Sequence, residues 1–346
     1  MEGGPPRGHI QRLTTQEPPA MGESSAEAVR AASSAVLAIV NPVARGGRGA
    51  EVWRRAEPAL RAGFPGLEFA ETTAPAHAET LAAEWARRRP DGIVLVVGGD
   101  GTVHEAVNGL LGDGAATGPL GVVPSGTGND FARSTGVPLD PAAAVERLAR
   151  WLRSGPARAV RRIDVGRLTF RDWSGAARTR LFLNSVSVGV SPTANRIAQG
   201  LRGVVPGPLR YPLGGVAAVL SGGAELYRVT SGGAVRFEGE ALNLTIANGP
   251  TFGGGLRISP GSSLTDGVLE QVIIGRLGAA RALLALGRLY GGTHVTMPGV
   301  SVTPVREALT IESVGGAMLA EADGQEFEIE GPLTVEPVPA ALSLLA

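Results

Sequence analysis

Short apolar runs alternate with amphipathic segments along the first half of the chain. Strand-like runs fall at 36–40, 67–71, 93–97 and 120–123. Helix-like segments fall between and after them, at 47–61, 75–89, 102–111 and 140–153. Apolar strands that alternate with helices predict a parallel sheet covered on both faces, so we expect an α/β domain at residues 34–164. Pro58 is expected to kink or shorten the first of these helices.

The second half changes character, because its apolar runs are separated by glycine clusters. β-rich runs fall at 180–190, 240–248, 267–274, 308–313, 317–322 and 326–329. This pattern predicts a mainly antiparallel β domain at residues 165–330. Residues 1–33 are expected to form a disordered leader, and residues 331–346 a terminal segment that can return to the first domain.

One stretch, 196–228, is apolar, rich in Gly and Pro, and carries Arg202, Arg210 and Arg228. Two interpretations stay open at this point: a wall against an apolar ligand, or a packed pair of core helices. Arg202 and Arg210 could meet anionic headgroups, but two arginines are too few to define a membrane-binding patch.

The amino-acid composition disfavours or excludes several classes of protein and site. The 32 basic and 32 acidic residues balance, whereas a protein that grips a nucleic acid backbone usually has a basic excess. The chain has no Cys, which excludes thiolate zinc sites, and no Lys, which excludes the P-loop motif and Schiff-base chemistry. No run approaches about 18 apolar residues, so we expect a cytoplasmic protein whose membrane contact, if any, is peripheral.

Three polar loops follow apolar strands in the first domain. The first begins at Asn41-Pro42, the second is Gly98-Gly99-Asp100-Gly101-Thr102 with Glu105 beyond it, and the third is Gly126-Thr127-Gly128-Asn129-Asp130. Each could be an ordinary turn or a helix cap. Glycine N–H groups at a helix start also bind phosphate, and a carboxylate such as that of Asp100 can hold Mg²⁺. Because such loops converge at one edge of a parallel sheet, together they favour a phosphate-and-metal site.

Other candidate motifs in the chain are weak. Asp266-Gly267 and Asp323-Gly324 read by themselves as a turn and a hairpin. The four histidines form no H-E-x-x-H motif, which disfavours a zinc hydrolase. Ser125 lacks a G-x-S-x-G frame, which disfavours a serine hydrolase.

In combination, these residues resemble the diacylglycerol kinase catalytic family, in its bacterial soluble lipid kinase branch. The resemblance runs over nearly the whole chain after residue 35. It is carried by Asn41-Pro42, Gly98 to Thr102 with Glu105, Pro124 to Arg133 (PSGTGNDFAR), Ile163-Asp164-Val165-Gly166, Asn184, Asn248-Gly249, Phe252 to Gly255, Asp266-Gly267 and Asp323-Gly324. It implies a nucleotide-binding α/β domain of the NAD kinase and phosphofructokinase type, followed by a β-rich lipid-substrate domain.

The resemblance also implies an ATP-dependent lipid kinase, which phosphorylates a hydroxyl of a lipid such as diacylglycerol or a long-chain base. The implied nucleotide-binding residues are Asn41, Pro42, Thr72, Gly98, Gly99, Asp100, Gly101, Thr102, Glu105, Gly126, Thr127 and Asn129. Asp100 and Asp130 would organise Mg²⁺ and the phosphates. Asp266, with the carbonyls of Ser263 and Val268, would hold a structural Mg²⁺, and a homodimer is a reasonable expectation.

Asp323 would help to deprotonate the lipid hydroxyl. Family members usually carry Asp-Gly-Glu here, whereas this chain has Asp323-Gly324-Gln325, with Glu326 next. Gln cannot accept a proton usefully near neutral pH, so Asp323 acts alone, Glu326 substitutes, or activity is weakened. The alternatives to a lipid kinase are an NAD-kinase-like enzyme and a nucleotide-binding regulatory protein.

Overall fold

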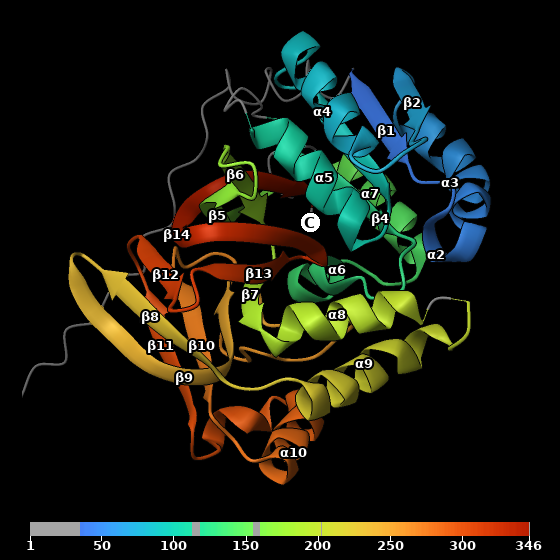
Figure 1. Ribbon diagram of the computed structural model, residues 1–346. Helices are drawn as coiled ribbons and strands as arrows, with labels where there is room; N and C mark the ends of the chain where they lie inside the picture. Colours follow the sequence, from blue (N-terminus) through green and yellow to red (C-terminus); the bar gives the residue numbers. More distant parts are fainter. Residues whose placement is uncertain (1–34, 113–117, 155–159, 202, 346) are drawn as a thin grey trace, which may run out of the picture.

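The computed structural model describes residues 35–112, 118–154, 160–201 and 203–345 (Figure 1). The predicted leader at 1–33 and Arg202 therefore lie outside the described residues. In the described part of the chain, no helix is long and apolar enough to cross a membrane.

The first half forms a parallel sheet between two layers of helices. Its strands are β1 (Val36–Val40), β2 (Leu67–Glu71), β3 (Ile93–Gly98) and β4 (Leu120–Pro124), in the order β2-β1-β3-β4. Its helices are α2 (Ala44–Gly47), α3 (Gly49–Gly63), α4 (His77–Arg88), α5 (Asp100–Leu111), α6 (Asp130–Thr135) and α7 (Pro141–Ser154). The expected helix start at Asp140 is confirmed, because its carboxylate accepts the Ala143 N–H at 2.9 Å.

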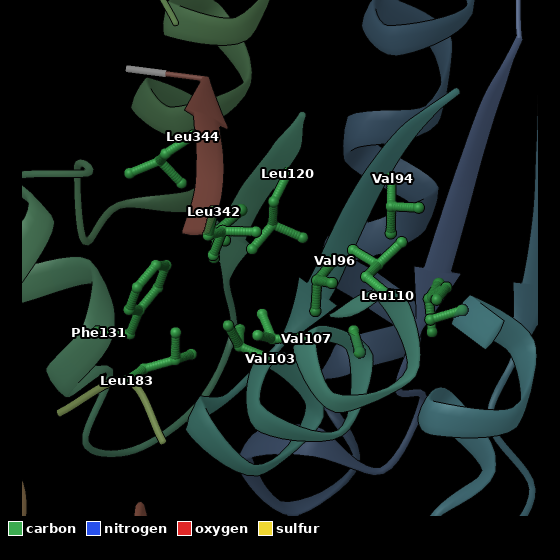
Figure 2. Packing of buried hydrophobic residues seen from close by; sticks show 14 of the residues in the cluster. Val94, Val96, Val103, Val107, Leu110, Leu120, Phe131, Leu183, Leu342 and Leu344 are labelled. Carbon is green, nitrogen blue, oxygen red and sulfur yellow. The ribbon is translucent and has the colours of Figure 1, made fainter. Parts of the chain in front are cut away.

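Both faces of this sheet are buried, which explains why its inner strands are apolar at every position. Val94 and Val96 face a core shared with α4 and α5, whereas Ile93, Leu95 and Val97 face a core shared with α3 and α7. Side chains from the second half also enter the first of these cores. Figure 2 shows three of them, Leu183, Leu342 and Leu344, beside Leu120, Phe131 and Val107.

The second half is antiparallel, as its pattern predicts. Its strands are β5 (Val160–Asp172), β6 (Ala177–Phe182), β7 (Ser185–Gly189), β8 (Glu225–Ser231), β9 (Ala234–Ala247), β10 (Leu269–Gly275), β11 (Val300–Val305), β12 (Leu309–Ser313), β13 (Ala317–Ala322) and β14 (Gln325–Leu345). Its helices are α8 (Val190–Gly200), α9 (Gly207–Ser221) and α10 (Ala279–Leu289), with a 3-10 turn at Thr293–Thr296. The pairings β7-β13-β14-β12-β8-β9-β7 close a ring, so this part is a barrel rather than an open sheet.

One strand joins the two halves into a continuous sheet. β14 pairs with β13, β12 and β5 in the barrel region, and its Leu344 is the parallel partner of Leu120 on β4. In Figure 1, β14 curves from the barrel up to the helical layer. The predicted boundaries at 164/165 and 330/331 fall inside β5 and β14, so neither marks a break between separate units.

Two local expectations need correction. Helix α3 continues through Pro58 to Gly63, so the proline does not shorten it. The expected strand at 180–190 is two strands, β6 and β7, separated at Leu183 and Asn184. The backbone N–H groups at that break bind a side chain from a distant hairpin, as described below, and this contact is invisible in local sequence.

Candidate active site

A cleft of about 1220 Å³ lies between the loops that follow β1, β3 and β4 and the hairpin that joins β13 to β14. Most of the predicted nucleotide and catalytic residues line it: Asn41, Thr72, Gly99, Asp100, Gly101, Thr102, Glu105, Gly126, Thr127, Asp130 and Asp323. Pro42, Gly98 and Asn129 support the same loops without lining the cleft. The structure thus brings the three predicted glycine-rich loops to one place.

Two of these loops touch backbone to backbone. A Cβ atom added to Gly126 would lie 2.6 Å from the Cα atom of Gly99, and one added to Gly99 would lie 2.9 Å from the Cα atom of Gly126. Asn129, in the left-handed region with φ of 53°, accepts the Gly126 N–H at 2.9 Å through its side-chain oxygen. Glycine is required here for close approach, and Asn129 locks the loop in place.

We expect Gly126→Ala to weaken nucleotide binding roughly tenfold, because an overpacked contact of about 1–3 kcal/mol must push the two loops apart. Isothermal titration with an ATP analogue measures this loss. Gly223→Ala is the matched control, since an added Cβ there meets no heavy atom within 4 Å. Equal affinity of the Gly126 variant and the control would show that the loop contact does not shape the nucleotide site.

Asn41 and Glu105 stabilise the segments around the cleft through hydrogen bonds. The Asn41 side-chain amide donates to the Thr102 hydroxyl at 2.9 Å, which ties the end of β1 to the start of α5. The Glu105 carboxylate accepts the N–H groups of Ala76 and Ala78 at 3.0 and 3.3 Å. Glu105 therefore caps the start of α4 from a neighbouring helix and holds the rim that carries Thr72.

The carboxylates of Asp100 and Asp130 face each other at the floor of the cleft. A Cβ atom on Gly128 would lie 3.1 Å from one Asp100 oxygen and 3.2 Å from one Asp130 oxygen. Asp100 accepts the Phe131 N–H at 3.0 Å, and Asp130 accepts the N–H groups of Gly254 and Gly255, both at 2.7 Å. Hydrogen bonds from the backbone thus orient both carboxylates toward the same small region of the cleft.

Burial raises the pKa of the Asp100 carboxyl to about 7, and repulsion from the Asp130 carboxylate adds to this shift. Burial also raises the pKa of Asp130. Among the described residues, six acidic residues and three arginines, Arg45, Arg196 and Arg210, line the cleft. A polyphosphate would meet net negative charge here, so this donor set fits a divalent cation that screens the two charges from each other.

Both oxygens of the Asp323 carboxylate accept hydrogen bonds from the backbone. One of its oxygens accepts the Leu183 N–H at 2.7 Å and lies 3.1 Å from His104 Nδ1. The other accepts the N–H groups of Asn184 and Ser185 at 2.8 and 3.3 Å. The side chain is only 1% exposed, so Asp323 ties the β13–β14 hairpin to α5 and to the break between β6 and β7.

The sequence reasoning missed a second acidic residue of this hairpin, Glu321. It is 7% exposed and lines the cleft, and burial raises the pKa of its carboxyl to about 8, with the charges of Glu326 and Asp323 adding to the shift. The available signal was one charged residue inside the apolar run 317–322. A lone Glu in a strand is ordinarily solvent-facing, which is why the signal is weak.

A small apolar pocket of about 70 Å³ opens beside the cleft, between α8, α9 and α10. It shares five residues with the cleft: Asn195, Tyr211, Phe252, Gly253 and Glu321. We call these five residues the seam. Helices α8 and α9 pack together, as one interpretation of the stretch 196–228 has it. Both helices also line this pocket, and its use by an apolar ligand stays a prediction.

The residues of the predicted structural metal site, Ser263, Asp266 and Val268, do not line the cleft. Asp266 is exposed and accepts the Val268 N–H at 3.1 Å, while the neighbouring Gly267 N–H binds Asp164. Among the described residues, no group of three or more His, Asp or Glu side chains is placed to hold a metal ion. A metal at Asp266 therefore stays a prediction.

Two family profiles match the chain in tandem. The diacylglycerol kinase catalytic domain matches residues 35–167, and the YegS C-terminal NAD kinase beta sandwich-like domain matches residues 184–346. A YegS-like candidate lipid kinase from Pseudomonas aeruginosa is 34% identical over 263 residues, which cover 72% of this chain and 73% of that protein. The chain belongs to the diacylglycerol kinase family. It is a kinase, as the resemblance of its motifs implies.

Other members of the diacylglycerol kinase family agree with this assignment. A diacylglycerol kinase from Mycobacterium tuberculosis is 29% identical over 314 residues, which cover 90% of this chain and 94% of that one. The crystal structure of a candidate diacylglycerol kinase from Bacillus anthracis matches with a TM-score of 0.71 at 25% identity, over 90% of this chain and 97% of that one. Yeast NADH kinase, at 13% identity and a TM-score of 0.52 over 90% and 82% of the two chains, shares the fold alone.

Proposed function

We propose that this kinase transfers the γ-phosphate of ATP to a hydroxyl group of a lipid, such as diacylglycerol or a long-chain sphingoid base. The observation that carries the proposal is the junction of two cavities. A polar cleft with glycine-rich loops lies beside an apolar pocket, and the five residues of the seam line both cavities. A lipid whose chain lay in the pocket would present its hydroxyl at the seam, next to the cleft assigned to the nucleotide.

The loops around Gly99 and Gly126 would bind the phosphates of ATP through backbone N–H groups at the start of α5. Asp100 and Asp130 would hold Mg²⁺, whose charge would offset that of the phosphates. The protein contributes mainly position and electrostatics to phosphoryl transfer, because this reaction asks little covalent chemistry of the enzyme.

Helix α9 supports access from a lipid surface. Leu209, Leu213, Val216 and Leu220 lie along one face of it and are 53%, 47%, 38% and 61% exposed. Gly215 and Val219, on the same helix, line the apolar pocket. We infer that the outer face of α9 makes a peripheral membrane contact where the acceptor leaves the bilayer.

Incubation with labelled ATP, Mg²⁺ and mixed micelles of dioctanoylglycerol, sphinganine or ceramide tests the proposal, with the product identified by mass. A phosphorylated lipid is expected. Phosphorylation of NAD with no lipid product would instead favour an NAD-kinase-like enzyme. ATP binding without transfer to any acceptor would favour a regulatory protein, in which case Gln325→Glu is the variant to test for recovery.

Filling the apolar pocket should impair lipid use selectively. Ala285 on α10 is 2% exposed and lines the pocket, so Ala285→Phe places a ring in the space assigned to the acyl chain. We expect the KM for the lipid to rise roughly 10- to 100-fold while ATP affinity is unchanged. Steady-state kinetics measure both, with Leu284→Phe as the control because Leu284 is 51% exposed. An equal loss of ATP affinity would point to a disturbed fold instead.

A further inference from the structure

The five residues of the seam include one carboxylate, that of Glu321. We propose that Glu321 is a catalytic residue that binds the acceptor hydroxyl and takes its proton during phosphoryl transfer, the role that Gln325 cannot perform. This inference rests on the proposed lipid kinase function and assigns to it a residue that none of the motifs identifies.

Strand register separates the two faces of the β13–β14 hairpin. Ala322 pairs with Gln325, and the Gln325 amide nitrogen lies 3.6 Å from the position of a Cβ on Gly101, on the nucleotide side. Glu321 pairs with Glu326, so these two carboxylates share the opposite face of the hairpin, toward α8. Glu321 thus stands on the acceptor side of the hairpin, and Gln325 on the nucleotide side.

The other carboxylates of the hairpin are already engaged. Both oxygens of Asp323 accept backbone N–H groups, and one of them also contacts His104. Glu326 accepts the Arg196 guanidinium at 3.0 Å and lies 3.5 Å from the Asn195 amide. Glu321 has a single donor among its described contacts, the Gly324 N–H. It is therefore the carboxylate with lone pairs left for a substrate.

The surroundings of Glu321 keep it protonatable in the working pH range. Burial raises its pKa most, and the charges of Glu326 on β14, Asp323 in the hairpin turn and Asp130 on α6 raise it further. The nearest cation on α8, Arg196, is paired to Glu326 and Glu328. A base whose pKa lies near the operating pH is well matched to proton transfer.

In the proposed step, one proton and the γ-phosphoryl group change places. Deprotonated Glu321 accepts the proton of the lipid hydroxyl, and the hydroxyl oxygen forms a bond to the γ-phosphorus of ATP. The bond between the γ-phosphorus and the bridging oxygen breaks, so that ADP leaves with that electron pair. Glu321 then returns its proton to solvent through the open cleft.

Glu321→Gln is the direct test, because it keeps size and hydrogen bonding while removing the base. The expected result is a fall in kcat of about 10²- to 10⁴-fold, with the KM for ATP and the affinity for an ATP analogue unchanged. In the wild type, kcat should rise with pH to a plateau above about 8, and this limb should be absent in the variant. Glu321→Asp should keep part of the activity, whereas the control Glu330→Gln, at an exposed position of β14, should match the wild type.

Three outcomes would overturn the inference. They are a Glu321→Gln variant with wild-type kcat, a defect confined to the KM of the lipid, and a pH limb that persists in the variant. A melting temperature measured in parallel identifies simple misfolding, and the wild-type pH profile with the Glu321→Asp variant then decides. A wild-type protein that phosphorylates no lipid would instead overturn the proposed function, and the inference with it.

Discussion

The Asp100→Asn variant should be more stable than the wild type in the absence of nucleotide, and nearly inactive. Asp100 is held beside the Asp130 carboxylate by backbone contacts, and burial and repulsion raise its pKa from 3.8 to about 7. Because the folded-state pKa lies above the unfolded value, the free energy of unfolding falls as the pH rises from about 4 to 7, and the penalty is complete above 7. Asn removes this penalty and can still accept the Phe131 N–H, so we expect a gain of about 1–2 kcal/mol, or roughly 1–3 °C, at pH 8.

The catalytic activity of the Asp100→Asn variant should fall, although its stability should rise. If Asp100 and Asp130 hold Mg²⁺ against the phosphates, loss of one charge should lower turnover by about 10³-fold or more. Thermal melts at pH 5 and pH 8, with and without Mg²⁺, measure the stability side, and labelled-phosphate transfer measures the other. Mg²⁺ should raise the melting temperature of the wild type but not that of the variant. Asp91→Asn, at an exposed turn, is the control, and a variant less stable than the wild type at pH 8 would contradict the argument.

The convergence of Asp100 and Asp130 could be predicted from sequence because both residues follow apolar strands of a parallel sheet. Strands buried on both faces leave a continuous apolar run, and β1 has the predicted bounds for that reason. The loops that follow them must meet at one edge, so the local pattern carries long-range information here. Thr72 and Glu105 were assigned to the nucleotide site by the family resemblance instead, and both line the same cleft.

The barrel and its last strand gave no comparable signal. β14 runs through Pro332, Pro337 and Pro339, and a sequence pattern with three prolines reads as a series of breaks. The structure accommodates the prolines with register shifts against β5 between Glu330 and Thr334 and between Val338 and Leu342. Closure of the barrel depends on the pairings of β14 with β13 and β12, and no local periodicity reports them.

Glu321 and His104 were missed for a related reason. His104 contacts Asp323 across 219 positions of sequence, and the role of Glu321 depends on which face of a hairpin meets α8. The sequence identified Asp323 as a candidate catalytic residue, but it did not reveal the groups that contact its carboxylate. A motif identifies a residue type, whereas the number of donors around a carboxylate decides whether it can act as a base or serves to hold the structure.

Asp323→Asn tests that distinction and should destabilise the protein by about 2–4 kcal/mol, because an amide NH₂ would replace one acceptor oxygen and face backbone N–H donors. The left-handed backbone at this position, with φ of 49°, is tolerated by Asn, so strain does not contribute to the loss. Chemical denaturation measures the change. The effect is opposite in sign to that of Asp100→Asn, although both variants make the same chemical substitution in the same cleft.

The kinetics of the Asp323→Asn variant distinguish a structural role of Asp323 from a role as the base. If Asp323 acts by holding the hairpin, Asp323→Asn should lower the activity, the ATP affinity and the free energy of unfolding together. A saturating concentration of ATP should then restore part of the activity and of the stability. If it is the base, kcat should fall alone while the free energy of unfolding is unchanged. His104→Gln removes the imidazole that contacts Asp323 and leaves its three backbone donors in place. It should therefore give a smaller loss in the same direction, since a holding role scales with the number of contacts removed.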